Sequence, residues 1–356
     1  MKVAILGAGF GGLAAGWFLT HYTTGKARID FFDPNPLGVG ASRIALGMVN
    51  PYMGKIAKRN FGTTRALREL HRLISASTKE MNGPLVSSNG ILRPAITDEI
   101  IAAFKERANE YDDLEWLDKK SALELIPEMT LPGHGGALYV KGGITVNIEK
   151  YIEGLWLACV RHAAKFTRLT VLKKDQLAPY DRVLIALGAN ALDFEVLKTL
   201  PMTRVKGQII QLEWPKGVAP LKMNLSGEGQ IIMSQDYESC FVGSTYEHDF
   251  TDSRAHPEEA RRQILAKIHP FYPALENAKM IACRARMRAS SKSRLPIIGQ
   301  LNEKVWYITG LGSKGFFYHG WAGKMAAQAM IMNDIRYIHP DFLCQLPATV
   351  QTQAQN

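Results

Sequence analysis

Cysteine is scarce in this chain of 356 residues. The four cysteines are widely spaced and form no CxxC pair: Cys159, Cys240, Cys283 and Cys344. This pattern predicts neither a disulfide framework nor a zinc site. The nine histidines show no metal-ligand spacing either, so we expect no bound metal.

Long hydrophobic runs are also absent from the sequence. The longest apolar stretches, such as residues 183–187, are far too short to cross a bilayer. Lys2 is followed by apolar residues, but a glycine turn interrupts them where a signal peptide would continue. We therefore expect a cytoplasmic protein without a membrane partner. The hydrophobic share of 46% and the charged share of 21% are those of a globular protein with a sizeable core.

The most informative motif that is present lies near the start of the chain, where an apolar strand leads into the turn GAGFGG and a helix of small residues. Gly7 permits the tight turn, Gly9 lets the backbone approach a pyrophosphate, and Gly12 lets the helix pack on the strand. A second expected strand ends in Asp33, whose carboxylate can accept hydrogen bonds from both ribose hydroxyls. These features predict a dinucleotide site; the alternative is a glycine-rich turn in an ordinary α/β domain.

Two further glycine-containing segments follow. Residues 38–51 include too many small side chains for a core helix, so we expect a loop that lies along a ligand. Residues 305–316 repeat the pattern of strand, glycine turn and helix start. One chain rarely binds two dinucleotides, so both turns are expected to hold one long cofactor. The first turn would hold its pyrophosphate, and the second a ring system that becomes anionic on reduction.

Strand and helix patterns interleave along the rest of the chain. Short strands separated by turn residues predict a mainly antiparallel sheet, at 135–140, 209–213, 230–234 and 240–244. Helices are expected at 64–79 and 148–163, and a buried parallel strand at 183–189.

This interleaving predicts an α/β fold in which a mainly antiparallel substrate domain is inserted into a discontinuous, Rossmann-like nucleotide-binding domain. The nucleotide-binding domain is expected to comprise residues 1–80, 144–200 and 290–340. The substrate domain is expected to comprise residues 81–143 and 201–289. Residues 345–356 are expected to form a flexible tail.

The chain is strongly basic, with a formal net charge of +10, and such a charge favours anionic partners. A first cluster of cations consists of Lys55, Lys58, Arg59, Arg65, Arg68 and Arg72. A second consists of Arg284, Arg286, Arg288, Lys292 and Arg294. A solvated surface is the more common explanation of such clusters, and contact of the first one with nucleic acid is the alternative.

Eight motifs stand in an order and spacing that resemble a known family: GAGFGGLAAG, FFDP, GASRIALGMVNP, GGITVNIEKYIEGL, YDRVLIALGANA, RVKGQIIQLE, RASSKSRLPIIG and TGLGSKGFF. The family is the D-amino-acid oxidase family of FAD-dependent amine oxidoreductases, and the likeness is to its glycine and sarcosine oxidases. The forms RVKGQ, RLPIIG and GLGSKG are most similar to the oxidase half of a tRNA-modifying protein in that family. There, FAD oxidises a carboxymethylaminomethyl group on the wobble uridine.

The resemblance implies FAD as the cofactor. The residues that would hold its ADP portion are Gly7, Gly9, Gly12 and Asp33, and those at the pyrophosphate and the approach to the flavin are Ser42 and Arg43. A turn beside the cofactor would contain Gly188. The residues against the isoalloxazine would be Gly310, Gly312, Lys314 and Gly315. The GLGSKG segment contains no cysteine, so FAD is expected to be bound without a covalent bond.

The resemblance also implies a substrate site around Arg288, which aligns with an arginine that binds the substrate carboxylate. A guanidinium suits that task because it offers two parallel charge-assisted hydrogen bonds and stays protonated. Two residues depart from the family pattern. Gln230 stands where relatives often have a tyrosine, and Arg286 where they have a glycine. We therefore expect an altered pocket, for which glycine is a less secure substrate.

The implied reaction is hydride transfer from the carbon next to nitrogen to flavin N5, followed by hydrolysis of the imine and reoxidation by oxygen or another acceptor. The expected substrate is a small carboxylate-bearing amine, with a modified tRNA as an alternative. An NAD-dependent dehydrogenase that uses only the first turn, and a non-catalytic flavin-binding protein, remain open. The aromatic candidates for the pocket wall are Tyr52, Tyr246, Tyr318 and His319.

Overall fold

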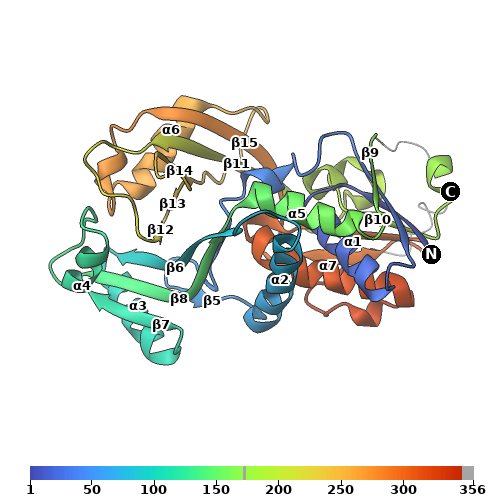
Figure 1. The fold of residues 1–356 in the computed structure, drawn as a ribbon, viewed down its shortest axis with the longest axis horizontal. Coiled ribbons are helices and arrows are strands. Elements are labelled where there is room, and N and C mark those ends of the chain that lie inside the picture. The colour runs from blue at the N-terminus through green and yellow to red at the C-terminus, as the bar shows by residue number, and fades with distance from the viewer. Residues whose placement is uncertain (171–173, 347–356) are drawn as a thin grey trace.

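The computed structural model describes residues 1–170 and 174–346 of the chain. Of the expected flexible tail, residues 347–356 lie outside the described residues. The chain forms two large sheets that stand side by side (Figure 1). A small third sheet pairs β4 (Tyr52–Met53) with β5 (Lys58–Arg59).

The first large sheet has six strands in the order β16-β17-β10-β1-β2-β9 and is parallel except for its edge strand β16. Its strands are β1 (Lys2–Leu6), β2 (Arg28–Asp33), β9 (Lys165–Arg168), β10 (Arg182–Ile185), β16 (Ile297–Gln300) and β17 (Val305–Thr309). The chain runs from β1 outward to β2 and β9, and later places β10 and β17 on the other side of β1. The carboxyl ends next to β1 therefore form a topological switch point, where ligands usually bind in such sheets.

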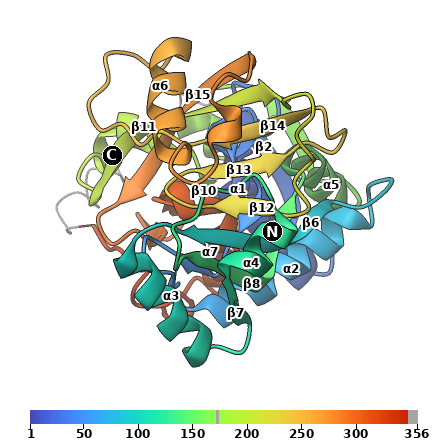
Figure 2. The same cartoon turned by 90° about the vertical axis from the view of Figure 1, so that its left-hand side faces the viewer.

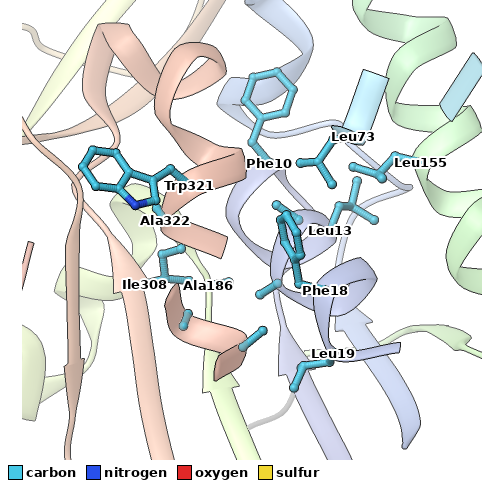
Figure 3. Close-up of a cluster of buried hydrophobic side chains, with 14 of the residues drawn as sticks. Phe10, Leu13, Phe18, Leu19, Leu73, Leu155, Ala186, Ile308, Trp321 and Ala322 are labelled. Carbon is cyan, nitrogen blue, oxygen red and sulfur yellow. The ribbon is translucent and has the colours of Figure 1, made fainter. Parts of the chain in front are cut away.

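Four helices pack together on one side of this sheet: α1 (Phe10–Tyr22), α2 (Thr63–Thr78), α5 (Ile148–Val160) and α7 (Gly315–Met332). Figure 3 shows Leu13 and Phe18 of α1 at the centre of this packing. Leu73 of α2 and Leu155 of α5 lie on one side of them, and Ile308 of β17 lies on the other (Figure 3). All five side chains are buried, so α1 and the glycine turn before it are held firmly in place.

The second large sheet has nine strands, in the order β15-β11-β14-β13-β12-β6-β8-β3 with β7 paired to β8. Neighbouring strands are antiparallel except for β12 and β6. The strands are β3 (Met48–Val49), β6 (Val86–Ala95), β7 (Leu114–Asp118), β8 (Gly136–Val146), β11 (Met202–Glu213), β12 (Asn224–Ser226), β13 (Gln230–Met233), β14 (Ser239–Gly243) and β15 (Met280–Ser291).

The larger sheet has two lobes, each covered by its own helices. Helix α6 (Pro257–Ile268) packs on β11 and β15, whereas α3 (Asp98–Glu110) and α4 (Lys119–Leu125) pack on β7 and β8. Strands β12 and β13 lie between these lobes (Figure 2).

The structure confirms the predicted α/β fold with one parallel and one mainly antiparallel sheet. The helix expected at 148–163 ends at Val160, and Ala163 has a left-handed φ of 61° that a helix cannot continue through. The strand expected at 183–189 ends at Ile185, before the chain turns at Gly188.

The predicted domain division remains a proposal. Three separated parts of the chain build the six-stranded sheet, and strands from both sides of residue 200 build the larger sheet. Strand β8 continues to Val146, past the expected boundary between residues 143 and 144.

Candidate active site

A cavity of about 1080 Å³ runs between the two large sheets. Its walls include the carboxyl ends of β1, β2 and β10 in the smaller sheet and parts of β6, β12, β13 and β15 in the larger one. A single small ligand usually occupies a site of roughly 300 to 1,000 Å³. The cavity slightly exceeds this range, which suits a ligand as long as a dinucleotide.

The glycine turn after β1 forms part of the cavity wall. Gly7 has a φ of 104°, and a Cβ on it would overlap the carbonyl oxygen of Ala186. Gly9 is the N-cap of α1 and also lines the cavity, so the positive end of the helix lies at the wall. Gly12 lies behind the turn, where a Cβ would overlap the carbonyl oxygen of Gly7. A close backbone cradle at a helix N-terminus is a place that a pyrophosphate fits.

Two side chains fix the edges of this cradle, and both line the cavity. Asp33 ends β2, and its carboxylate accepts hydrogen bonds from the backbone N–H of Ala8 at 3.0 Å and of Asn35 at 2.9 Å. The hydroxyl of Ser42 accepts a hydrogen bond from the N–H of Phe10 at 2.9 Å. The loop expected to lie along a ligand is thereby tied to the start of α1.

Three more predicted cofactor residues line the cavity: Gly188, Gly312 and Gly315. Gly188 follows β10, and Gly312 and Gly315 stand just before and at the start of α7. The second glycine turn and the first therefore open onto the same cavity. This arrangement suits one extended cofactor that spans both turns.

Three other predicted cofactor residues do not line the cavity: Arg43, Gly310 and Lys314. Arg43 forms an ion pair with Glu149 at 3.3 Å. Gly310 has a φ of 69° and shapes the turn from behind. Burial lowers the pKa of Lys314, and the nearby charges of Arg294 and Lys58 lower it further. Contact of these three residues with a cofactor remains a prediction.

Arg288, on β15, lines the cavity, and its backbone pairs with Val205 of β11. Its guanidinium lies over Gly207, where a Cβ would stand 2.7 Å from Nη1, so only glycine leaves this space free. Nη1 donates a hydrogen bond to the carbonyl oxygen of Thr245 at 3.4 Å. Burial lowers the pKa of Arg288, and the nearby Tyr246 and Glu247 partly offset this effect. No carboxylate among the described residues lies within ion-pair distance of its guanidinium. The arginine is free to bind an anion.

The two residues that depart from the family pattern lie in different places. Gln230, at the start of β13, lines the cavity. Arg286 does not line it; its Nε donates a hydrogen bond to the carbonyl oxygen of Val39 at 2.9 Å. Arg286 therefore holds the ligand-facing loop from outside, and Gln230 is the departure that lies in the cavity wall.

Of the four aromatic candidates, Tyr246 lines the cavity, with its hydroxyl 2.8 Å from Oγ of Ser290. The other three have partners elsewhere, and none of them lines the cavity. Tyr52 donates to Asp113 at 2.5 Å, and Tyr318 donates to the carbonyl oxygen of Phe61 at 3.0 Å.

His319 is fully buried in the core between α1, α5 and α7. Its Nδ1 donates to the carbonyl oxygen of Phe316 at 2.8 Å, so Nε2 accepts the hydrogen bond of the Tyr151 hydroxyl at 2.6 Å. Burial lowers the pKa of His319 to about 4, which keeps the ring neutral. The role of this histidine is structural.

The sequence did not point to two cations that line the cavity, Arg93 of β6 and Lys267 of α6. Nζ of Lys267 donates a hydrogen bond to the carbonyl oxygen of Ser244 at 2.9 Å, and burial lowers its pKa. A charged residue in the apolar run GILRPAI was the one available sign of Arg93.

In residues 1–170 and 174–346, no helix is long and apolar enough to span a membrane. In the same ranges, no group of three or more His, Cys, Asp or Glu side chains is placed to hold a metal ion.

Comparisons with a family model and with curated proteins agree on one family. The family model "DAO: FAD dependent oxidoreductase" matches residues 2–329 of the chain. The glycine oxidase of Geobacillus kaustophilus is 23% identical over 330 residues, which is 85% of each chain. The tRNA 5-methylaminomethyl-2-thiouridine biosynthesis bifunctional protein MnmC of Idiomarina loihiensis is 27% identical over 243 residues, which is 64% of this chain and 40% of that protein. The chain thus spans less than half the length of this MnmC relative.

Solved structures show the same fold. The crystal structure of the Geobacillus kaustophilus glycine oxidase has a TM-score of 0.77 at 20% identity, covering 94% of this chain and 95% of that one. The crystal structure of iminodiacetate oxidase (IdaA) from Chelativorans sp. BNC1 has a TM-score of 0.74 at 20% identity, covering 93% and 95%.

Proposed function

Because this chain belongs to the family of FAD dependent oxidoreductases, we propose that it oxidises the C–N bond of an amine that carries a carboxylate. The observation that carries this proposal is Arg288, a buried cation with no carboxylate of the described residues within ion-pair distance, in the cavity that both glycine turns line. When bound there, FAD would supply a hydride acceptor at N5.

The residues of the cavity fit FAD along its length. Gly7, Gly9 and the start of α1 would bind the pyrophosphate, and Asp33 would accept hydrogen bonds from the ribose. The backbone N–H groups around Gly312 and Gly315 would face the flavin ring, where the positive end of α7 stabilises negative charge. An NAD-dependent dehydrogenase would leave this second turn without a role.

Arg288 would orient the substrate through its carboxylate. The planar guanidinium makes two parallel hydrogen bonds, which fix both the position and the direction of the carbon next to nitrogen. Gly207 keeps the space for the guanidinium, and Thr245 restrains one of its nitrogens. The oxidation requires no side-chain base, because hydride transfer needs only the neutral amine in the correct place.

The test is anaerobic reduction of the bound flavin by a panel of amines: glycine, N-methylglycine, D- and L-amino acids and N-carboxymethyl amines. Loss of the oxidised-flavin absorbance with a carboxylate-bearing amine supports the proposal. Arg288→Lys should raise KM at least about tenfold, because lysine cannot make the planar fork. Arg286→Lys is the matched control, since Arg286 lies on the same strand outside the cavity. A yellow protein that none of the amines reduces would instead indicate a non-catalytic flavin-binding protein.

Modified tRNA is a second candidate substrate, supported by the net charge of +10 and the likeness to MnmC. The first cationic cluster is partly neutralised, because Lys55 pairs with Glu99, and Arg68 and Arg72 pair with Glu69. Within the part of the chain that the structure describes, the cluster members without an ion pair are Lys58, Arg59 and Arg65. These three side chains would contact phosphates if the substrate is a tRNA.

A further inference from the structure

Arg93 is a second buried arginine in the wall of the same cavity. It lies on β6, its residue is 4% exposed, and it lines the cavity together with Pro94. Nη1 donates to the carbonyl oxygen of Tyr52 at 2.6 Å, and Nη2 donates to the carbonyl oxygen of Gly54 at 2.5 Å. Its Cζ lies 5.0 Å from the centre of the Phe104 ring. The guanidinium is therefore held rigidly, with two of its donor nitrogens used.

The charge of Arg93 has no counter-charge in the described structure. Its Nε–H has no hydrogen-bond partner, and no carboxylate of the described residues forms an ion pair with it. Burial alone lowers its pKa, to about 10, so the group stays protonated near neutral pH. A buried cation without an anion is costly to the fold, and such groups are normally paired.

Anchoring a loop does not explain this charge. The two carbonyl oxygens of Tyr52 and Gly54 accept hydrogen bonds, and a neutral donor such as an amide side chain could satisfy them without the cost of a buried charge. What a guanidinium adds is a positive charge at the cavity wall. That charge becomes favourable when an anion enters the cavity.

Arg93 and Arg288 lie on strands that are far apart in the larger sheet. Strands β11, β14, β13 and β12 stand between β15, which carries Arg288, and β6, which carries Arg93. Neighbouring strands are about 4.8 Å apart, so the two backbones are separated by several strand spacings. The two guanidinium groups also have different partners, the carbonyl oxygen of Thr245 for Arg288 and those of Tyr52 and Gly54 for Arg93, so they occupy different parts of the cavity wall.

We propose that Arg93 forms a second anion subsite, which binds a carboxylate or phosphate of the substrate at a distance from the C–N bond that is oxidised. This inference rests on the proposed function, because Arg288 is taken to bind the first carboxylate. It implies an elongated, doubly anionic amine rather than glycine. Apolar side chains that line the cavity near Arg93 would contact the linker between the two groups: Met53, Pro94, Ile96, Ile100 and Phe104.

Dead-end ligands test the subsite without turnover. The holoenzyme is titrated with unbranched dicarboxylates from succinate to sebacate, so that the longer members can span widely separated sites, and with monocarboxylates of the same lengths. The change in flavin absorbance gives Kd. We expect at least one dicarboxylate to bind about tenfold tighter, or more, than its monocarboxylate. Phosphonocarboxylates of matched length show whether the second group is a phosphate or a carboxylate. Equal affinity within every matched pair overturns the proposal.

Variants separate charge from loop anchoring. Arg93→Gln should abolish the preference for the dicarboxylate and leave monocarboxylate binding unchanged, whereas Arg93→Lys should retain part of the preference. Tyr52→Phe is the control, because Tyr52 lies in the loop that Arg93 anchors and this change removes the hydrogen bond from its hydroxyl to Asp113. It should leave the preference for the dicarboxylate intact. If Arg93→Gln weakens both ligand classes equally, Arg93 only anchors the loop and the proposal is overturned. Where Arg93→Gln does not fold, the wild-type titration decides.

The two proposals fail in different ways. If no carboxylate of either class perturbs the flavin, the proposed function and the second subsite both fail. If monocarboxylates bind in a manner that depends on Arg288 but dicarboxylates gain nothing, only the second subsite fails.

Discussion

The guanidinium of Arg288 lies directly over the backbone of Gly207, on the neighbouring strand β11. A Cβ at position 207 would stand 2.7 Å from Nη1 and overlap the central carbon of the guanidinium. The glycine of the RVKGQ motif and the arginine of the RASSKSRLPIIG motif therefore form one structural unit. The position of the arginine depends on the absence of a side chain opposite it.

Gly207→Ala should displace Arg288 and raise KM for a carboxylate-bearing amine at least about tenfold, since a charge-assisted hydrogen bond is lost or lengthened. The FAD content should change little, because neither Gly207 nor Arg288 belongs to the pyrophosphate cradle. Steady-state kinetics and the ratio of flavin to protein absorbance measure both effects. Gly133→Ala is the control, because a Cβ there meets nothing within 4 Å. Unchanged KM in Gly207→Ala would contradict the assigned role of Arg288.

FAD should be released when the protein is precipitated with acid, because no cysteine stands in the GLGSKG segment. Yellow colour that stays on the pellet would indicate a covalent bond. Asp33→Ala should weaken FAD retention by about 1.5 to 3 kcal/mol for each hydrogen bond lost to the ribose. Fluorescence of the flavin released during dialysis measures the retention. Full retention by Asp33→Ala would exclude Asp33 from the cofactor site.

The glycine turns could be predicted from the sequence, because the backbone conformation that each turn needs depends only on residues close together in the chain. Gly7, Gly188 and Gly312 have φ of 104°, 57° and 56°, a backbone conformation that other residues rarely adopt. The pattern of strand, turn and helix could therefore be recognised from neighbouring residues alone. The prediction that both turns serve one ligand came from the rarity of two dinucleotides in one chain, and the two turns do line one cavity.

The sequence was insufficient where a residue's role depends on distant parts of the chain. The sequence did not show that Arg43 pairs with Glu149, and the cofactor contacts predicted for Arg43 and Lys314 remain predictions. Arg93 belongs to no motif, and it reaches the cavity only because β6 and the loop around Tyr52 fold together. Burial and ion pairing of this kind follow from tertiary packing, which local patterns do not encode.

The stability of the protein should fall as the pH drops from about 6.5 to about 4, in part because of His319. Burial lowers its pKa from 6.5 to about 4, so the unfolded chain binds a proton in this range that the folded chain does not. The contribution lost is roughly 3 kcal/mol. Urea unfolding at pH 7.5, 5.5 and 4.5 measures it. His319→Gln does not titrate and should show a smaller decline; an equal decline would contradict the depressed pKa.

If the substrate is a tRNA, binding should weaken steeply as salt increases, because cations that contact phosphates release bound counterions. The plot of log Kobs against log salt should have a slope of about −0.7 to −0.9 for each contact. The double variant Lys58→Gln/Arg65→Gln should make this slope less steep by about 1.4 to 1.8. Lys55→Gln is the matched control, since Lys55 is already paired with Glu99 at 2.6 Å and should change the slope less. Filter binding of bulk tRNA at several salt concentrations gives the slopes. Binding that is undetectable at low salt, or that does not respond to salt, would favour oxidation of a free amine, whose anionic groups are bound inside the cavity and need no surface cations.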